Sequence, residues 1–328
     1  MSYVQETGIA FITWLQSFHE QIDFIMGLLS LLVRPELVIV FVLPLLFWNV
    51  SARLIAPLFA LMMLDVMLGD ILKVLFAQPR PWWIADLMPI DPVTSIYSSP
   101  GGYTSFATVF FGYLYLHTRK KSWLVIGMVF ITVTGLAKMY QAALMPDHMF
   151  WGLIQGVLVL VVYARYQRQA WEVFISSSGT RWMILGLGLV ALAYLAMLIV
   201  FQIHDGYRIP LQYLEYKVVP SHRLSSGGIT IAAGFFLGCA LGYKANLMAN
   251  LEPTEQLTVW RKLLVSATGL IMMMLTMVII RGFLTDIADN RLITWLVNFS
   301  LTALSGGVIF YWIPKWFNTW PRGKGLET

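Results

Sequence analysis

Long apolar runs separated by short polar stretches fill most of the chain. A membrane-spanning helix needs roughly 20 mainly apolar residues, so the shorter runs are expected to extend into their polar flanks. The pattern predicts an all-α fold, a polytopic membrane bundle of about nine transmembrane helices. The predicted spans are Phe24–Trp48, Leu54–Phe76, Ser105–His117, Trp123–Ala137, Met149–Ala164, Met183–Ile203, Gly227–Tyr243, Leu263–Ile280 and Ile293–Ile313.

The first run contains polar residues that leave its interpretation open. Arg34, Pro35 and Glu36 interrupt it, and proline and paired charges are poorly accommodated inside a lipid-facing helix. A short interfacial helix followed by a short span is the alternative to one continuous span. The number of spans therefore changes by one between the two interpretations.

Composition agrees with a lipid environment and limits the kinds of partner. Hydrophobic residues make up 58% of the chain and charged residues 12%, against roughly 25% charged in a soluble domain. The net charge of +5 would suggest a nucleic-acid partner in a soluble protein. Here the basic residues lie mostly in short loops between apolar runs, so no nucleic-acid partner is expected. Cys239 is the sole cysteine, which excludes an intramolecular disulfide and a thiolate zinc cage, and no metal or cofactor is predicted.

The distribution of Lys and Arg predicts the orientation in the membrane. The 23 residues before the first run contain neither residue. Placing the N-terminus outside and the C-terminus in the cytoplasm puts more Lys and Arg in cytoplasmic segments than in outer ones, as the positive-inside rule requires. We therefore predict a multi-pass protein of the cell (inner) membrane with this orientation.

Three polar stretches stand out, and all lie on the predicted outer side. They are Lys73–Pro81, Ser98–Ala107 and Ala137–Gly152. They contain three cations with few acidic neighbours, together with glycines that precede a helix and leave backbone N–H groups at its positive end. Arginine binds phosphate as a fork and lysine binds it as a point charge. The stretches together predict a site for a tetrahedral oxyanion, although snorkelling alone would explain Lys73.

These stretches resemble the three signature motifs of the type-2 phosphatidic acid phosphatase superfamily, K-x6-R-P, P-S-G-H and S-R-x5-H-x3-D. The first motif is complete, with Lys73, Arg80 and Pro81. Residues Asp70–Trp83 and the span count are similar to the glucose-6-phosphatase branch. The resemblance implies a phosphatidic acid phosphatase-like core at residues 54–166, preceded by a segment with the first span (1–53) and followed by a four-span region (167–328).

The resemblance also implies roles for individual residues. In that family the first-motif Lys and Arg, the second-motif Ser and the third-motif Arg hold phosphate. The third-motif His attacks phosphorus, the following Asp orients it, and the second-motif His protonates the leaving oxygen, with no metal needed. The phosphate-binding residues expected here are Lys73, Arg80, Gly101, Gly102 and Lys138.

The chain departs from the family pattern where the chemistry occurs. Gly101 stands in place of Ser, Tyr103 in place of the general-acid His, and Lys138 in place of Arg. Leu144 occupies the nucleophile position and His148 the position of its Asp. Because leucine has no lone pair, the family's mechanism is not expected. We predict a catalytically impaired protein that binds a phosphorylated lipid or polyprenyl phosphate at the extracytoplasmic side; a protein partner is neither predicted nor excluded.

Two alternative functions follow from other residues. His148, next to Asp147, could supply a displaced nucleophile with Tyr103 as proton donor, giving an active lipid- or sugar-phosphate phosphatase. A phenol is a poor acid–base group at neutral pH, and His148 could equally be a polar residue satisfied at a helix start. Asp65, deep in the second run, would serve an anion or lipid transporter or pair with another helix.

Several polar residues have simpler explanations. Asp70 lies three residues before Lys73, which predicts an ion pair within one helix. His204 and His222 lie in the predicted outer loop after the sixth run, where they would cap the site or be solvated. The segment Pro220–Gly228 resembles a phosphate loop before a helix, but ordinary loop chemistry explains it equally well.

Overall fold

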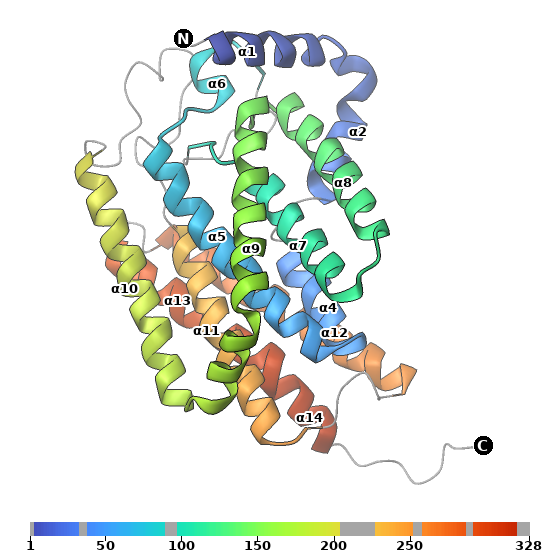
Figure 1. Ribbon diagram of the computed structural model, residues 1–328, viewed down its shortest axis with the longest axis vertical. Helices are drawn as coiled ribbons and strands as arrows, with labels where there is room; N and C mark the ends of the chain where they lie inside the picture. Colours follow the sequence, from blue (N-terminus) through green and yellow to red (C-terminus); the bar gives the residue numbers. More distant parts are fainter. Residues whose placement is uncertain are drawn as a thin grey trace. The chain divides into compact units, whose positions relative to one another are not determined.

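The computed structural model shown in Figure 1 describes residues 3–32, 38–88, 97–203, 227–251, 258–286 and 291–319. All regular elements in these ranges are helical, which confirms the predicted all-α class. They are α1 (Tyr3–Gln16), α2 (His19–Leu32), the π-helical turn η1 (Val38–Val42), α4 (Leu43–Asn49), α5 (Ala52–Phe76), α6 (Pro81–Ile84), α7 (Gly102–Thr118), α8 (Ser122–Tyr140), α9 (Pro146–Ser176), α10 (Gly179–Ile203), α11 (Gly227–Met248), α12 (Val259–Asp286), α13 (Arg291–Gly307), the π-helical turn η4 (Val308–Trp312) and α14 (Ile313–Thr319).

Five helical segments among the described residues are long and apolar enough to cross a membrane. They are Ala52–Ile84, Ser122–Tyr140, Pro146–Ser176, Gly228–Met248 and Trp295–Thr319. The chain is therefore a membrane protein with several spanning helices, and the count of nine stays a prediction. The first apolar run is divided into α2, η1 and α4, while Arg34, Pro35 and Glu36 lie outside the described residues.

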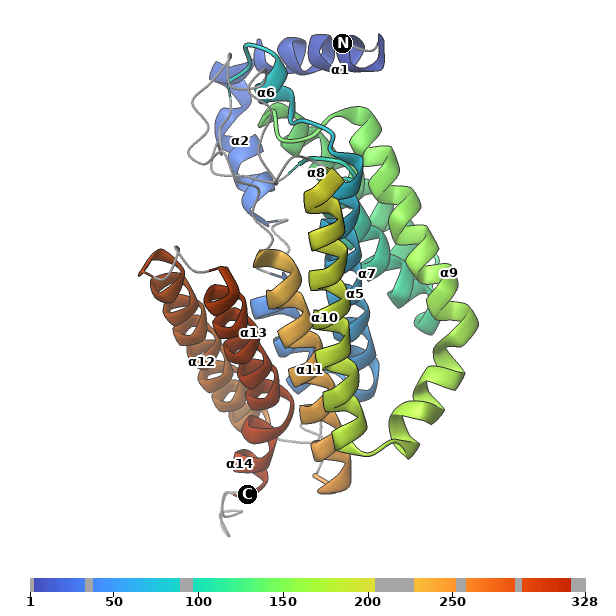
Figure 2. The ribbon, with the colours of Figure 1, turned by 90° about the vertical axis from the view of Figure 1, so that its left-hand side faces the viewer.

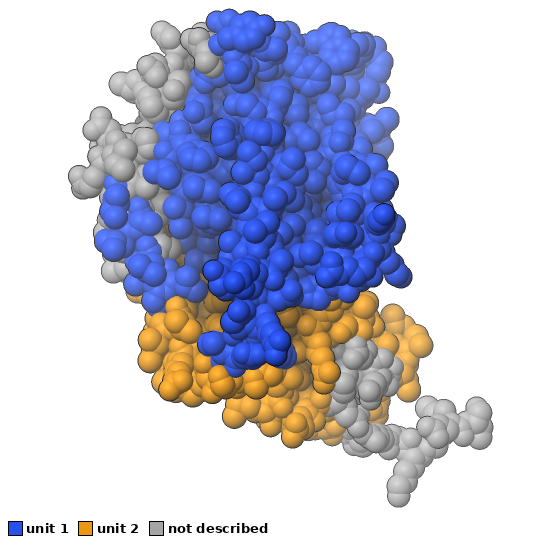
Figure 3. All heavy atoms as spheres, in the orientation of Figure 1, with its two compact units in different colours: residues 1–37, 61–173, 188–229 blue, residues 38–60, 174–187, 230–328 orange. Residues whose placement is uncertain are grey.

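The chain divides into two compact units, which Figure 3 distinguishes by colour. Unit 1 comprises residues 1–37, 61–173 and 188–229, and unit 2 comprises residues 38–60, 174–187 and 230–328. All predicted site residues belong to unit 1. The domain boundaries expected from the sequence, at 53/54 and 166/167, stay a prediction.

Within unit 1, glycines on α9 bring that helix close to α7. A Cβ on Gly156 would lie 2.6 Å from Cβ of Thr108, and one on Gly152 would collide with the backbone carbonyl of Gly101. Small residues four positions apart allow two membrane helices to approach closely. The approach places the start of α9 beside the start of α7, where the second and third sequence motifs lie.

Unit 2 is held together by aromatic packing and by polar contacts to backbone carbonyls. Trp48 of α4 is buried against Gly269 of α12 and donates its indole N–H to the carbonyl of Ile309 at 3.1 Å. Lys244 of α11 donates to the carbonyls of Phe174 and Ile175 at 2.6 and 3.3 Å, and also to that of Ser177. A cation at these carbonyls satisfies the end of the helix that terminates there.

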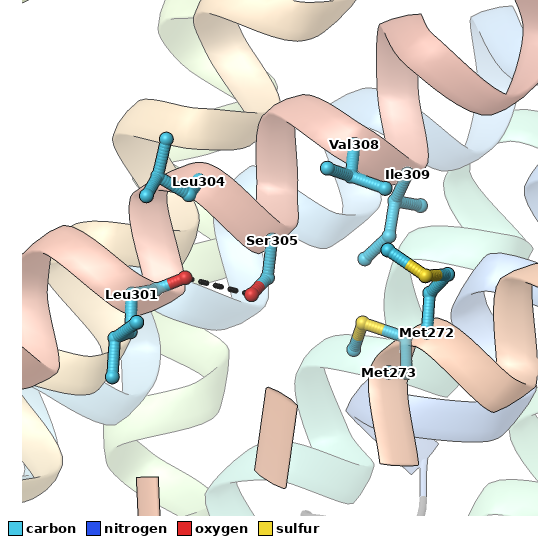
Figure 4. A pocket seen from close by; sticks show the side chains of 7 residues that line it. All are labelled: Met272, Met273, Leu301, Leu304, Ser305, Val308 and Ile309. Atoms are coloured by element: carbon cyan, nitrogen blue, oxygen red, sulfur yellow. Dashed lines mark hydrogen bonds between the residues drawn. The ribbon is translucent and has the colours of Figure 1, made fainter. Parts of the chain in front are cut away.

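An apolar pocket lies between α12 and the adjacent α13 and η4, which run side by side in Figure 2. Its volume is about 100 Å³. Ser305 contributes a hydroxyl to its wall but donates it to the carbonyl of Leu301 at 2.7 Å, as Figure 4 shows. None of the predicted site residues lines this pocket, which is formed by Met272, Met273, Leu301, Leu304, Ser305, Val308 and Ile309.

Candidate phosphate-binding site

Lys73 of the first motif lies next to the start of α7. Its Nζ forms an ion pair with Asp70 Oδ1 at 2.8 Å, which confirms the predicted pair within α5. A Cβ on Gly102 would lie 3.4 Å from the same Nζ. The ammonium group therefore sits beside the first residue of α7, where the helix dipole is positive and an anion would be stabilised by both.

Arg80 joins the first motif to the third. Its Nη1 donates to the backbone carbonyl of Ala143 at 3.0 Å, and Ser98 donates its hydroxyl to the same oxygen at 2.8 Å. Ala143 lies in the turn between α8 and α9. The Arg80 side chain is buried. Arg80 of the first motif and Ser98 of the second therefore bind the same carbonyl oxygen in the third.

Gly101 caps the start of α7 in contact with the third motif. Its N–H donates to the backbone carbonyl of His148 at 2.7 Å. A Cβ here would lie 2.8 Å from that oxygen and 3.1 Å from Cδ1 of Leu144. The serine that the family carries at this position would not fit without a shift. The Gly101 amide is bound within the protein, so its predicted role towards phosphate stays a prediction.

Lys138 and Tyr103 face each other. The Lys138 Nζ lies 4.4 Å from the centroid of the Tyr103 ring, within the range of a cation–π contact. The same nitrogen donates to Ser30 Oγ at 2.5 Å and to Gln141 Oε1 at 3.0 Å, and Lys138 is 2% exposed. Buried Lys138 therefore joins half-buried Tyr103 of α7 to Ser30 of α2.

His148 is satisfied at the start of α9. Its Nδ1 accepts the backbone N–H of Met145 at 3.4 Å, as a side chain does when it reaches back to cap a helix. Its Nε2 lies 3.8 Å from Asp147 Oδ2, and the residue is 1% exposed. This geometry agrees with the interpretation of His148 as a helix-start residue. Because Nδ1 accepts this bond, the neutral imidazole carries its proton on Nε2, and neither ring nitrogen has a free lone pair for attack on a substrate in this arrangement.

Leu144, which the motif resemblance predicts to stand at the nucleophile position, is buried beside Gly101. It is 3% exposed and its side chain lies against Gly101. The contacts connect the site residues in three groups: Lys73 with Gly102; Gly101 with Leu144 and His148; and Lys138 with Tyr103. Arg80 reaches the second group through the turn at Ala143. Each of the three groups thus includes a residue at the start of α7, and the second group also includes the start of α9.

The sequence interpretation missed four side chains at the site. Ser30 and Gln141 bind Lys138, and no pattern in the sequence singles out Ser30 within its apolar run. Ser99 and Thr104 flank the two glycines; each is 1% exposed, and their hydroxyl oxygens have no hydrogen-bond partner among the described residues. Their place within the second stretch was the available signal, because buried hydroxyls next to an anion site can contact the ligand.

Asp65 lies deeper in α5 and links three helices. Ser105 of α7 donates to its Oδ1 at 2.5 Å, and Gln155 of α9 donates to the same oxygen at 2.8 Å. The carboxylate is therefore paired with neighbouring helices, as one of the two interpretations expected. The Asp70 carboxylate lies against the start of α11, where a Cβ on Gly228 would collide with it. The positive end of that helix stabilises an anion.

The arrangement of the three motifs can be compared with known families. Residues 54–172 match the model of the PAP2 superfamily. This match confirms the resemblance to the type-2 phosphatidic acid phosphatase superfamily, and the PAP2 region contains all the predicted site residues. No curated protein and no solved structure matches the chain. His204, His222 and most of the segment Pro220–Gly228 lie outside the described residues.

Proposed function

We propose that this PAP2-type membrane protein binds a phosphorylated lipid or polyprenyl phosphate at the extracytoplasmic side of the cell membrane and does not hydrolyse it. The observation that carries the proposal is the set of side chains that surround the start of α7. Cationic side chains and two buried hydroxyls gather at the start of α7, where Leu144 occupies the nucleophile position. The proposed orientation keeps the N-terminus outside and the C-terminus in the cytoplasm.

Recognition in this proposal uses charge together with helix-end geometry. Lys73 lies beside Gly102 at the positive end of α7, so a phosphate oxygen placed there would receive an ionic contact and the helix-end field. Ser99 and Thr104 would donate the neutral hydrogen bonds. Arg80, the second cation of the first motif, would present its guanidinium to the phosphate. A lipid tail would leave the site between helices into the surrounding acyl chains.

The absence of hydrolysis follows from the same contacts. Leu144 cannot attack phosphorus, and it is packed against Gly101. His148 uses Nδ1 for the Met145 amide, and Tyr103 lies under the Lys138 ammonium. A nucleophile, its orienting carboxylate and a proton donor would all have to be rebuilt before the family's reaction could proceed.

The proposal is tested by binding and turnover measurements on the full-length protein in detergent. Phosphatidic acid and a polyprenyl phosphate should bind, and Lys73→Ala or Arg80→Ala should weaken binding by about 10- to 100-fold, the effect of losing one charged hydrogen bond. Lys121→Ala is the matched control, because this exposed lysine lies at the opposite end of α8. Phosphate release should stay at background. Binding that is indifferent to both site variants would refute the proposal.

One alternative keeps a specific contact in its favour. Nε2 of His148 lies 3.8 Å from Oδ2 of Asp147, so a carboxylate stands beside the imidazole. An active lipid- or sugar-phosphate phosphatase would attack phosphorus from His148 Nε2 after that nitrogen has given its proton to Asp147, and it predicts phosphate release that disappears in His148→Ala. The third candidate function is an anion or lipid transporter that uses buried Asp65. It predicts transport of the anion or lipid that is lost in Asp65→Asn.

A further inference from the structure

Helix α1 presents one face to the rest of unit 1. Gly8, Ile12 and Leu15 are its buried residues, and at 100° per residue they fall on one side of the helix. A Cβ on Gly8 would lie 3.3 Å from Cδ of Pro146. At the end of α1, the Gln16 side chain donates to the backbone carbonyl of Tyr140 at 2.7 Å. This face therefore packs on the end of α8 and the start of α9.

A second face of α1 is aromatic and uncovered. Tyr3, Val4 and Trp14 are 82%, 54% and 57% exposed, and Phe18 in the following turn is 41% exposed. The rings of Trp14 and Phe18 meet edge to face with centroids 5.3 Å apart. At 100° per residue, Val4 lies about 40° from Gly8, next to the buried face, and Trp14 and Tyr3 follow in the same direction at about 120° and 140°.

The third face of α1 is polar. Glu6, Thr13 and the following Ser17 are exposed. At 100° per residue they lie about 140–180° from Gly8, on the other side of the helix from Val4 and Trp14. The helix thus has a protein side, an apolar aromatic side and a polar side in succession. A helix that lies flat at a membrane surface beside its own bundle needs this succession, because it meets protein, lipid and water on three different sides.

The level of α1 along the bundle agrees with this pattern. Its contacts are to Tyr140 and Pro146, which are the ends of the candidate spans Ser122–Tyr140 and Pro146–Ser176. Figures 1 and 2 both show α1 lying crosswise to α8 and α9 at this end. Trp and Tyr concentrate where spanning helices leave the hydrocarbon. The aromatic face therefore lies level with the ends of two candidate spans.

We propose that α1 is an interfacial helix that docks on the bilayer surface through Tyr3, Val4, Trp14 and Phe18. The surface it fits is the interface of neutral or zwitterionic lipid. Residues 1–33 contain no Lys or Arg, so attraction to anionic lipid contributes nothing to docking and apolar burial supplies it. Because α1 also packs on Pro146, beside the start of α9, docking holds the candidate site at head-group level.

The test measures the depth of two faces of the same helix. Spin labels are attached at Val4→Cys on the aromatic face and at Thr13→Cys on the polar face, in a Cys239→Ala background of the full-length protein in phosphatidylcholine nanodiscs. Collisions with dissolved oxygen, which concentrates in lipid, and with a water-soluble nickel chelate are measured by EPR. Lys120→Cys, in the exposed turn between α7 and α8, serves as the aqueous reference.

The expected result is a Val4 label that favours oxygen and is shielded from nickel, and a Thr13 label that resembles the Lys120 reference. Adding phosphatidylglycerol to the nanodiscs should leave the oxygen and nickel accessibility of both labels unchanged. A Val4 label as accessible to nickel as the reference overturns the proposal, and so does shielding that appears only with the anionic lipid. The readout involves no phosphate ligand, so it stands or fails separately from the proposed function.

Discussion

Substitution of Gly101 by serine, the residue the family has at this position, is expected to destabilise this protein. The backbone at Gly101 has φ −66°, a conformation that any residue adopts, so glycine is not needed there for its backbone freedom. The obstacle is contact: the new Cβ would lie 2.8 Å from the carbonyl oxygen of His148 and 3.1 Å from Cδ1 of Leu144. The carbonyl belongs to the first turn of α9 and cannot rotate away.

The cost has two parts that the structure defines. Relief of the contact requires α7 and α9 to separate, which loosens a close helix packing at about 1–3 kcal/mol. It also weakens the bond from the Gly101 N–H to the same carbonyl, worth about 0.5–1.5 kcal/mol. The free energy of unfolding should therefore fall by about 2–4 kcal/mol, and Gly101→Ala should cost nearly as much because its Cβ is the same.

Thermal unfolding in detergent measures this difference, and Gly102→Ala is the matched control. A Cβ on Gly102 would make ordinary contacts at 3.4 and 3.6 Å with the flexible end of Lys73, so that variant should remain within about 0.5 kcal/mol of the parent. A Gly101→Ser protein as stable as the parent would refute the reasoning. Equal losses in the Gly101 and Gly102 variants would show that the effect is not the contact with α9.

Three further predictions concern single polar contacts. Ser105→Ala removes a donor from buried Asp65 and should lower the free energy of unfolding by about 1–3 kcal/mol; combined Ser105→Ala and Asp65→Ala losses that simply add would contradict the coupling. Lys244→Met leaves the carbonyls of Phe174, Ile175 and Ser177 without this donor and should also cost about 1–3 kcal/mol in thermal unfolding, whereas Lys120→Met, on an exposed residue, should change little. Leu144→His alone should leave phosphate release at background in a colorimetric assay, because position 148 still lacks the orienting carboxylate; measurable release would contradict this.

Much of the fold and of the family assignment could be predicted from the sequence. Apolar run length and charge depletion indicate spanning helices, because transfer of a segment into lipid depends on a sum over its own residues. The first motif, complete at Lys73, Arg80 and Pro81, was sufficient to indicate the superfamily that residues 54–172 match. The absence of a nucleophile at Leu144 was equally visible, since it is a property of one side chain.

The partners of the site residues were decided only by the tertiary structure. The hydroxyl of Ser30 reaches Lys138 across 108 positions of sequence, and the carbonyl of His148 accepts the Gly101 amide because glycines on α9 admit α7 closely. Helical periodicity says which side chains share a face, but not which helix that face meets. Hydrogen bonds depend on separations of a few tenths of an ångström between segments far apart in the chain, and only the packing of the helices sets those separations.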